Sequence, residues 1–329
     1  MKILMFGTRP DEQPATKEWA DANNVTVDAT PEQLSLDNVD KVAGYDGISV
    51  LQLEPLEDPK VYEALAKHGI KNLAVRSTGY EIYNLKAARD NGITVTNVPA
   101  YSPRSVAEHT LALTMTMLRK IHMIEVNEHH NDFSWAGVEA PEIHNLTVGI
   151  IGAGKIGSTV ARIFKALGST VIATDPIHRP ELADTLDYVD YDTLLAKADI
   201  VTMHTPLTDD MFHFMDAKRF KQMKKSAIFI NASRGKVVNT PDLIDALKNG
   251  EIQSAGLDTV EDEDAYFSHK VPGDKTGNPY IDTLLPMKNV VLTPHIAFYT
   301  DMAVKNMVQI SLNNAKQIID GETPFSPVN

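Results

Sequence analysis

Residues 148–175 read VGIIGAGKIGSTVARIFKALGSTVIATD. An apolar run leads into glycines at positions 152, 154 and 157, an amphipathic segment follows, and a second apolar run ends at Asp175. This order of features is typical of a strand, a tight turn, a helix and a second strand. The stretch therefore predicts a β-α-β unit near the middle of the chain.

The glycine spacing of this unit is that of a dinucleotide-binding turn. Gly152 makes the turn, Gly154 lets the backbone approach a pyrophosphate, and Gly157 lets the helix lie close to the strand. The helix N-terminus offers N–H groups to the phosphates. Asp175 is placed to bind the ribose hydroxyls and its charge disfavours a 2′-phosphate, so NAD is predicted rather than NADP. The alternative is that Asp175, which precedes Pro176, only shapes a turn.

The composition limits the class of protein. The chain has 329 residues, which is the length of two domains. A net charge of -13 argues against nucleic-acid binding, and the absence of cysteine excludes disulfides and thiolate chemistry. No apolar run is long enough to span a membrane, and the N-terminal one is too short for a signal peptide. A cytoplasmic protein without a membrane partner is expected.

Short apolar runs alternate with helical patterns along the whole chain. This alternation predicts an α/β fold whose parallel sheets are covered by helices on both faces. A helix that is apolar nearly all round is expected at about 103–123, and a last helix at about 300–319 is expected to pack on the first domain. Strands are expected at residues 2–6, 25–29, 47–51, 73–77, 93–98, 147–151, 170–174, 200–204, 227–232, 254–258 and 290–293.

Three side chains in the second half carry the expected chemistry. Arg234, Glu263 and His295 lie in segments that each follow a predicted strand. Ligands of open α/β sheets bind at the carboxyl ends of the strands. A guanidinium binds a carboxylate through paired hydrogen bonds, and an imidazole backed by a carboxylate transfers protons near neutral pH. Together with a nicotinamide cofactor, the three residues predict the reduction of a 2-keto acid.

Several segments also match one known family. They are NVPAYSPRSVAEHT, LTVGIIGAGKIG, HTPLT, INASRGKVV, GLDTVEDE, NVVLTPHIAFYT and KQIIDGETPFSPV. On these segments the chain resembles the NAD-dependent D-2-hydroxyacid dehydrogenases over its whole length, in particular the branch of D-lactate and D-2-hydroxyisocaproate dehydrogenases. The resemblance implies two Rossmann-like domains with a cleft between them. A flavodoxin-like substrate-binding domain would comprise residues 1–100 and 300–329, and an NAD-binding domain residues 101–299. A homodimer joined through a segment at about 101–147 is also implied.

The resemblance implies a role for each residue that matches a family motif. Arg234, Glu263 and His295 would be catalytic, with Glu261 as the competitor for the role of the glutamate. The cofactor would be held by the glycine turn and by later strand ends, namely Gly152, Gly154, Lys155, Ile156, Gly157, Asp175, Thr205, Pro206, Ala232, Ser233 and Asp258. The substrate would be held by Ser77, Thr78, Gly79, Tyr101, Arg234, Phe298 and Tyr299, the first three through backbone N–H groups.

Two departures from the relatives concern the substrate. The relatives usually read RNVG where this chain reads RSTG, which places Ser77 and Thr78 at the edge of the pocket. Lactate enzymes commonly carry a tyrosine near position 52, where this chain has Leu51 and Gln52 and is closer to the isocaproate type. The expected reaction is the reduction of pyruvate to D-lactate. Larger 2-keto acids are the alternative, because the loss of an aromatic wall leaves room for a longer side chain.

The sequence leaves three further interpretations open. Trp135 resembles a tryptophan that enters the partner's active site, or it only packs at an interface. A non-catalytic NAD-sensing protein is a remote alternative, although the chain retains the whole set of arginine, glutamate and histidine. A metal-dependent hydrolase built on Glu128, His129 and His130 is disfavoured, because adjacent histidines do not share a helix face. No metal is therefore expected.

Overall fold

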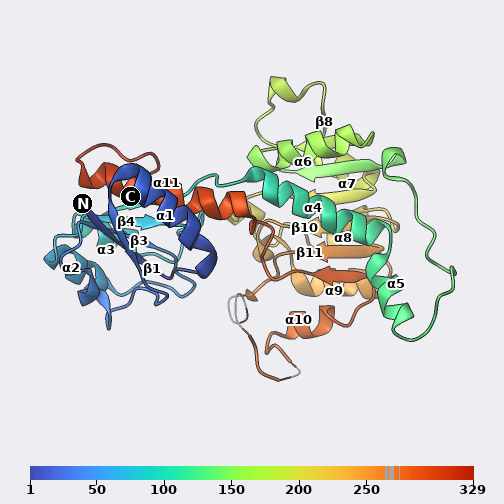
Figure 1. Cartoon of the computed structure of the whole chain (residues 1–329). Helices are drawn as coiled ribbons and strands as arrows, with labels where there is room; N and C mark the ends of the chain where they lie inside the picture. The colour runs from blue at the N-terminus through green and yellow to red at the C-terminus, as the bar shows by residue number, and fades with distance from the viewer. Residues whose placement is uncertain (264–265, 267–269, 274) are drawn as a thin grey trace. The chain divides into compact units, whose positions relative to one another are not determined.

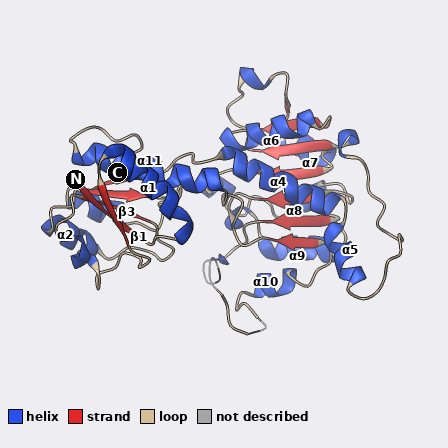
Figure 2. Ribbon diagram, viewed as in Figure 1, coloured by secondary structure: helices blue, strands red, loops and turns tan. Residues whose placement is uncertain are grey.

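The computed structural model describes residues 1–263, 266, 270–273 and 275–329. The chain forms two compact units, Met1–Ser102 with Tyr299–Asn329 and Pro103–Phe298. Each unit is built on one parallel sheet with helices on both faces (Figure 2). The boundaries of the units lie beside the domain boundaries expected from the sequence.

The first unit has a five-stranded sheet in the order β2-β1-β3-β4-β5. This is the strand order of flavodoxin-like sheets, and its switch point lies between β1 and β3. The strands are β1 (Lys2–Phe6), β2 (Thr26–Ala29), β3 (Gly47–Val50), β4 (Asn72–Val75) and β5 (Thr94–Thr96).

Successive side chains of β1 point to opposite faces of the sheet, so the first unit has a hydrophobic core on each face. Ile3 and Met5 pack with α1 and α11, whereas Leu4 and Phe6 pack on the other face with α2 and α3. Figure 1 shows α11, in red, beside strands from the opposite end of the chain, which confirms the packing expected for the last helix. The helices are η1 (Pro10–Glu12), α1 (Gln13–Asn23), η2 (Val39–Val42), α2 (Pro59–Lys67), α3 (Leu85–Asp90) and α11 (Asp301–Ile319).

The second unit has a seven-stranded sheet in the order β12-β11-β10-β9-β6-β7-β8. The chain runs outward from β6 to β8 and then returns to β9 on the other side of β6, so the switch point lies between β6 and β9. The strands are β6 (Thr147–Ile151), β7 (Thr170–Thr174), β8 (Asp187–Tyr188), β9 (Ile200–Met203), β10 (Ile228–Asn231), β11 (Ser254–Leu257) and β12 (Val290–Leu292). The sequence patterns did not predict β8.

Two groups of helices cover this sheet. Helices α4 and α6 pack on one face, and α7 to α10 pack on the other. None of the helices in the described residues has the length and apolar character needed to cross a membrane. The elements are α4 (Pro103–Leu118), α5 (Ile121–Glu128), η3 (Ile143–Asn145), α6 (Lys155–Ala166), η4 (Pro180–Leu182), α7 (Tyr191–Lys197), η5 (Asp209–Met211), α8 (Ala217–Gln222), η6 (Gly235–Val237), α9 (Thr240–Lys248) and α10 (Pro279–Leu284).

The prediction of one helix over 103–123 is wrong beyond Leu118. Lys120 adopts a left-handed conformation with φ of 54°, and the chain starts again as α5. The ammonium group of Lys120 donates to the carbonyls of Gly137 and Glu139, each at 2.8 Å, and these bonds tie the break to the following loop. Helix α4 has a wide buried face, whereas α5 has no buried residue.

Candidate active site

The glycine turn lies between β6 and α6, at the switch point of the second sheet. Gly152 has φ of +94°, and a Cβ there would lie 2.6 Å from the carbonyl oxygen of His204. A Cβ on Gly157 would overlap the carbonyl oxygen of Gly152. Both glycines are therefore needed by the packing of the chain itself. A Cβ on Gly154 would meet nothing within 4 Å, so this glycine leaves open space.

The open space at Gly154 fits a bound dinucleotide. It lies in front of the first residues of α6, Lys155 and Ile156, where backbone N–H groups and the helix dipole favour an anion. Thr205, which follows β9, gives a second indication of a bound cofactor. Its hydroxyl is buried and has no hydrogen-bond partner among the described residues. A cofactor that supplied a polar atom here would satisfy this hydroxyl. Pro206 follows it in the same segment.

Asp175 follows β7 directly and lies beside the glycine turn. Its Oδ2 accepts a hydrogen bond from the Ala153 N–H at 2.8 Å, and its Oδ1 accepts one from the Ile177 N–H at 2.8 Å. The second bond shows that Asp175 also shapes the turn around Pro176. Oδ1 accepts a further bond from Nη1 of Arg179 at 3.2 Å, a partner that the sequence patterns did not indicate.

His204 ends the segment of β9 beside Gly152. The residue is half-buried, but its Nδ1 is shielded from solvent and has no partner among the described residues. Its Nε2 lies 3.0 Å from the hydroxyl of Thr202. Burial lowers the pKa of His204 from 6.5 to about 3. The imidazole is therefore neutral at physiological pH.

Arg234 is carried by a turn that a buried asparagine holds. Asn231, at the end of β10, accepts bonds from the N–H and the hydroxyl of Ser233 at 3.1 and 2.8 Å. Its amide donates to the carbonyl of Arg234 at 3.0 Å. Ala232 and Ser233 are buried, whereas the guanidinium of Arg234 is half-buried and donates to the Ser233 carbonyl at 2.9 Å. No local sequence pattern marks Asn231 as a functional residue.

The structure brings His295 and Glu263 into contact. Nδ1 of His295 lies 2.7 Å from Oε1 of Glu263. The other oxygen of Glu263 accepts the Val260 N–H at 2.9 Å, so both carboxylate oxygens are held. His295 has φ of 53°, a conformation that non-glycine residues rarely adopt, and its ring packs edge-on against Phe298. A strained backbone at such a residue is typical of functional sites.

Asp258 holds the turn that carries His295. Its carboxylate accepts bonds from the hydroxyl of Thr293 at 2.6 Å and from the N–H groups of residues 296–297 at 2.9 Å each. Burial acts to raise the pKa of Asp258, but the hydrogen bonds from His109, Thr293 and the two N–H groups outweigh it, and the net pKa is lowered. Asp258 is thus a buried anion whose oxygens are engaged by this turn.

Glu261, the competitor for the role of Glu263, binds a different histidine. Its Oε1 lies 2.7 Å from Nε2 of His213. The neighbouring Asp262 pairs with Lys236 at 3.2 Å. The segment 261–263 therefore presents three acids to three separate partners, and only Glu263 contacts His295.

The expected substrate loop follows β4 in the first unit. Its hydroxyls are bound internally, because Ser77 donates to the Gly79 carbonyl at 2.7 Å and Thr78 donates to the Val98 carbonyl at 2.8 Å. Asn97 donates to the Thr78 carbonyl at 2.8 Å. Among the described residues, the N–H groups of 77–79 donate no hydrogen bond. Such a loop offers N–H groups to an anion.

The remaining expected substrate residues lie in different units. Phe298 ends the second unit beside His295, and Tyr299 begins the segment that returns to the first unit. The ring of Tyr299 lies under the guanidinium of Arg9, 5.4 Å from its centroid. The carbonyl of Tyr101 accepts a bond from the Asn306 amide at 2.6 Å.

The side chain of Gln52 is bound within the first unit. Gln52 is buried and forms a two-way amide contact with Leu34, at 2.8 and 2.9 Å. Leu51 is the half-buried side chain at this strand end. The segment of Glu128, His129 and His130 holds no metal cluster, since no group of three potential ligands occurs among the described residues.

Comparison with known proteins places the chain in a family. The family model for the D-isomer specific 2-hydroxyacid dehydrogenase, NAD binding domain, matches residues 111–297. A D-2-hydroxyacid dehydrogenase (NAD(+)) of Clostridioides difficile is 40% identical, and the alignment covers 100% of both chains. The chain belongs to the D-2-hydroxyacid dehydrogenase family. It is an oxidoreductase of the α/β class, and its cofactor is NAD.

Solved structures of this dehydrogenase family have the same fold. A D-lactate dehydrogenase from Sporolactobacillus sp. is 46% identical with a TM-score of 0.93 and covers 100% of this chain and 99% of its own. An NAD-complexed D-isomer specific 2-hydroxyacid dehydrogenase from Lactobacillus delbrueckii ssp. bulgaricus is 42% identical with a TM-score of 0.92, over 100% of both chains. The two-sheet architecture is therefore that of the dehydrogenase family.

Proposed function

We propose that the chain reduces pyruvate to D-lactate with NADH. The contact of 2.7 Å between His295 and Glu263 carries this proposal, because a ketone reduction needs a proton donor as well as a hydride donor. Bound NADH supplies the hydride to C2 of the keto acid. The proton comes from the imidazolium of His295, and the Glu263 carboxylate orients the ring and stabilises its positive charge.

Arg234 binds the substrate in this proposal. Its guanidinium is half-buried at the carboxyl end of β10, in a turn held by Asn231. Two parallel N–H donors match the two oxygens of a carboxylate, and a nearby cation also polarises the carbonyl that accepts the hydride. The N–H groups of Ser77, Thr78 and Gly79 bind the substrate carboxylate as well.

The cofactor site uses the glycine turn and the strand ends around it. Gly154 provides the space for the pyrophosphate, and Asp175 binds the adenosine ribose. Lys155, Ile156, Thr205, Pro206, Ala232 and Ser233 line the same edge of the sheet, and Asp258 acts there by holding the turn of His295.

A D-lactate dehydrogenase is favoured over an enzyme for larger keto acids by the similarity to lactate enzymes at up to 46% identity. In this proposal Leu51, Tyr101 and Tyr299 of the first unit and Phe298 of the second unit each contribute apolar surface to substrate binding.

We also infer a cytoplasmic homodimer. NADH, which the reaction consumes, is held inside cells. The dimer is supported by the segment that follows α4, because α5 has no buried residue, Phe133 is 71% exposed and Trp135 is 91% exposed. Exposed aromatic side chains of this size mark interaction surfaces.

The decisive test is an NADH oxidation assay on the purified chain with pyruvate, phenylpyruvate and 2-ketoisocaproate. We expect the highest kcat/KM with pyruvate and D-lactate as the product, identified by chiral chromatography. A higher kcat/KM with 2-ketoisocaproate assigns the chain to the isocaproate type. NADH binding without turnover on any keto acid would show a non-catalytic NAD-binding protein.

A further inference from the structure

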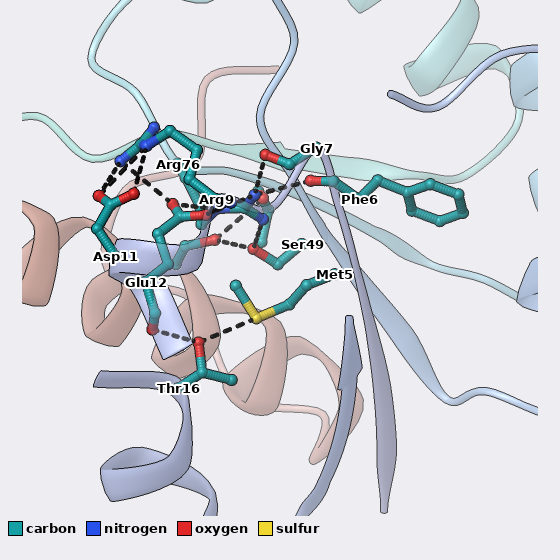
Figure 3. A network of polar contacts seen from close by, with 11 residues as sticks. Met5, Phe6, Gly7, Arg9, Asp11, Glu12, Thr16, Ser49 and Arg76 are labelled. Carbon is teal, nitrogen blue, oxygen red and sulfur yellow. Dashed lines mark hydrogen bonds and ion pairs between the residues drawn. The ribbon is translucent and has the colours of Figure 1, made fainter. Parts of the chain in front are cut away.

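Arg76 is a fully buried charge at the end of β4. The side chains of Arg76 and Glu12 are 0% and 1% exposed, and Nε donates to Oε1 of Glu12 at 3.1 Å. Nη1 donates to the hydroxyl of Ser49 at 3.0 Å, and Nη2 donates to the carbonyls of Phe6 and Gly7 at 2.7 and 3.1 Å. Figure 3 shows the guanidinium surrounded by these groups, so all three of its nitrogens are in use.

The partners of Arg76 surround the switch point of the first sheet. Phe6 ends β1 and Ser49 lies in the neighbouring β3, while Arg76 follows β4. Gly7 has φ of +64°, and a Cβ there would overlap the carbonyl oxygen of Leu51, so the loops after β1 and β3 are in direct contact. Ligands of open α/β sheets bind at this edge. Arg76 thus joins three strand ends beneath the expected substrate site.

Glu12 extends these contacts to a second expected substrate residue. Its Oε2 accepts the N–H of Arg9 at 2.9 Å, and Nη2 of Arg9 lies 3.7 Å from its Oε1. The guanidinium of Arg9 in turn lies over the ring of Tyr299. One buried carboxylate therefore connects Arg76 with the segment that carries Tyr299.

The stability of the fold alone does not explain why the buried ion pair of Arg76 and Glu12 is present. Desolvation offsets most of the attraction of a buried ion pair, and an apolar pair of similar volume often holds a fold equally well. An apolar pair cannot hold four polar partners in fixed directions, whereas the planar guanidinium does. The contribution of Arg76 and Glu12 is therefore one of geometry.

Both ends of the substrate loop are fixed. Arg76 immediately precedes Ser77, and its own N–H donates to the Val50 carbonyl at 2.8 Å. At the other end, the hydroxyl of Thr78 is bound to Val98. The N–H groups of residues 77–79, which follow this fixed start, donate no hydrogen bond among the described residues. Their direction depends on where Arg76 holds the start of the loop.

We propose that Arg76 and Glu12 are positioning residues for substrate binding, because their buried contact sets the direction in which the N–H groups of residues 77–79 meet the substrate carboxylate. Neither side chain touches the substrate. This inference rests on the proposed function, which assigns the loop to the keto acid.

The test compares Arg76→Met/Glu12→Leu, which removes both charges together, with Leu65→Ala, which opens a cavity in the core of the same unit. For the double variant we expect KM for pyruvate to rise about tenfold and kcat to change less than about threefold. The affinity for oxamate, an isostere of pyruvate, should fall in parallel in the NADH complex. The Kd for NADH should not change. Leu65→Ala should lower the Tm and leave KM unchanged.

Two single variants keep the inference testable if the double variant does not fold. Arg76→Lys retains the charge but loses the fork of donors, and Glu12→Gln retains the volume and most of the hydrogen bonds. We expect the KM of Arg76→Lys to rise more than that of Glu12→Gln. The inference is overturned if the folded double variant, or the folded Arg76→Lys variant, keeps the KM and the oxamate affinity of the wild-type chain. In that case, turnover of pyruvate by the wild-type chain still supports the proposed function. A wild-type chain without turnover on any keto acid would remove both.

Discussion

Glu261 and Glu263 are neighbouring acids of one segment with different partners. Glu263 binds His295 and Glu261 binds His213, each at 2.7 Å. The spacing from Asp258 favoured Glu263 in the sequence, and the contact with His295 depends on the turn that Asp258 holds at residues 296–297. The chemical role of a carboxylate is thus decided by the histidine that it reaches.

This difference makes Glu261 a matched control for Glu263. Glu263→Gln should lower kcat for pyruvate reduction by about 10²-fold, because a neutral amide no longer stabilises the imidazolium of His295. Glu261→Gln should change kcat by less than about threefold, since its contact lies at His213. Steady-state kinetics at pH 7 measure both variants. Equal losses in the two variants would contradict the assignment of Glu263.

Arg234→Lys tests the carboxylate clamp. A lysine keeps the positive charge but supplies one donor point in place of a planar fork. We expect KM for pyruvate to rise and kcat/KM to fall by about 10²-fold. Arg219→Lys on α8, whose guanidinium lies beside Asp216, serves as the control. Wild-type kinetics of Arg234→Lys on pyruvate would show that the clamp role is wrong.

Arg179 leads to a prediction about the preference for NAD over NADP. It donates to Asp175 at 3.2 Å, so neutralising Asp175 leaves a guanidinium where the 2′-phosphate of NADP would lie. Asp175→Asn should bind NADPH at least about tenfold more tightly than the wild-type chain does. The double variant Asp175→Asn/Arg179→Ala should lose this gain. Quenching of protein fluorescence gives both dissociation constants, and equal NADPH affinity of the two variants would exclude Arg179 as the phosphate ligand.

Sequence reasoning identified the three glycines by their spacing, and His295 by its place after a predicted strand and by the family resemblance. Asn231, Arg179 and the pair of Arg76 with Glu12 were missed. Glu12 and Arg76 lie 64 positions apart, and only the pairing of β1, β3 and β4 brings them together. No local pattern of residues contains that information.

Among the elements, strands were predicted better than helix ends. The strands at Thr147–Ile151 and Thr170–Thr174 have the predicted bounds, because continuous apolar runs between turns identify buried strands. The two residues of β8 form an edge strand that is too short for such a pattern. The break at Lys120 was also missed. Its ammonium group binds the carbonyls of Gly137 and Glu139, which lie in a later loop that no local pattern connects with Lys120.

His204, which follows β9, should make the free energy of unfolding depend on pH. Burial lowers the pKa of His204 to about 3, whereas the unfolded chain has a histidine pKa near 6.5. Between these values the unfolded state binds more protons, so stability is complete above about pH 6.5 and is lost as the pH falls towards 3. The free energy of unfolding of the wild-type chain should therefore fall by about 1–2 kcal/mol more between pH 7 and pH 5 than that of His204→Gln.

Denaturant titrations at the two pH values measure this difference. His129→Gln is the control, because His129 is exposed at the end of α5. Its free energy of unfolding should follow the wild-type pH dependence. An unchanged pH dependence in His204→Gln would show that the imidazole titrates in the folded chain as it does in water.

At the scale of the whole molecule, both sheets carry a glycine in the same structural position. Gly7 in the first unit and Gly152 in the second each follow the strand at the switch point, and each has a positive φ. A side chain at either glycine would meet the carbonyl oxygen after the neighbouring strand, at Leu51 or at His204. The chain thus provides one strand-end site in each unit, which matches a reaction with two ligands, a keto acid and NADH.

The last prediction concerns the proposed dimer. The two phenylalanines with the largest exposed fractions among the described residues allow a matched test. Phe133 lies near Trp135 and is 71% exposed, whereas Phe325 in the first unit is 72% exposed. If the segment after α5 joins two subunits, Phe133→Ser and Trp135→Ser should each weaken dimerisation at least about tenfold, because buried aromatic side chains dominate such interfaces. Phe325→Ser should not. Light scattering over a dilution series measures the dimer fraction. A wild-type monomer at micromolar concentration, or an equal loss in Phe325→Ser, would show that this segment is not the interface.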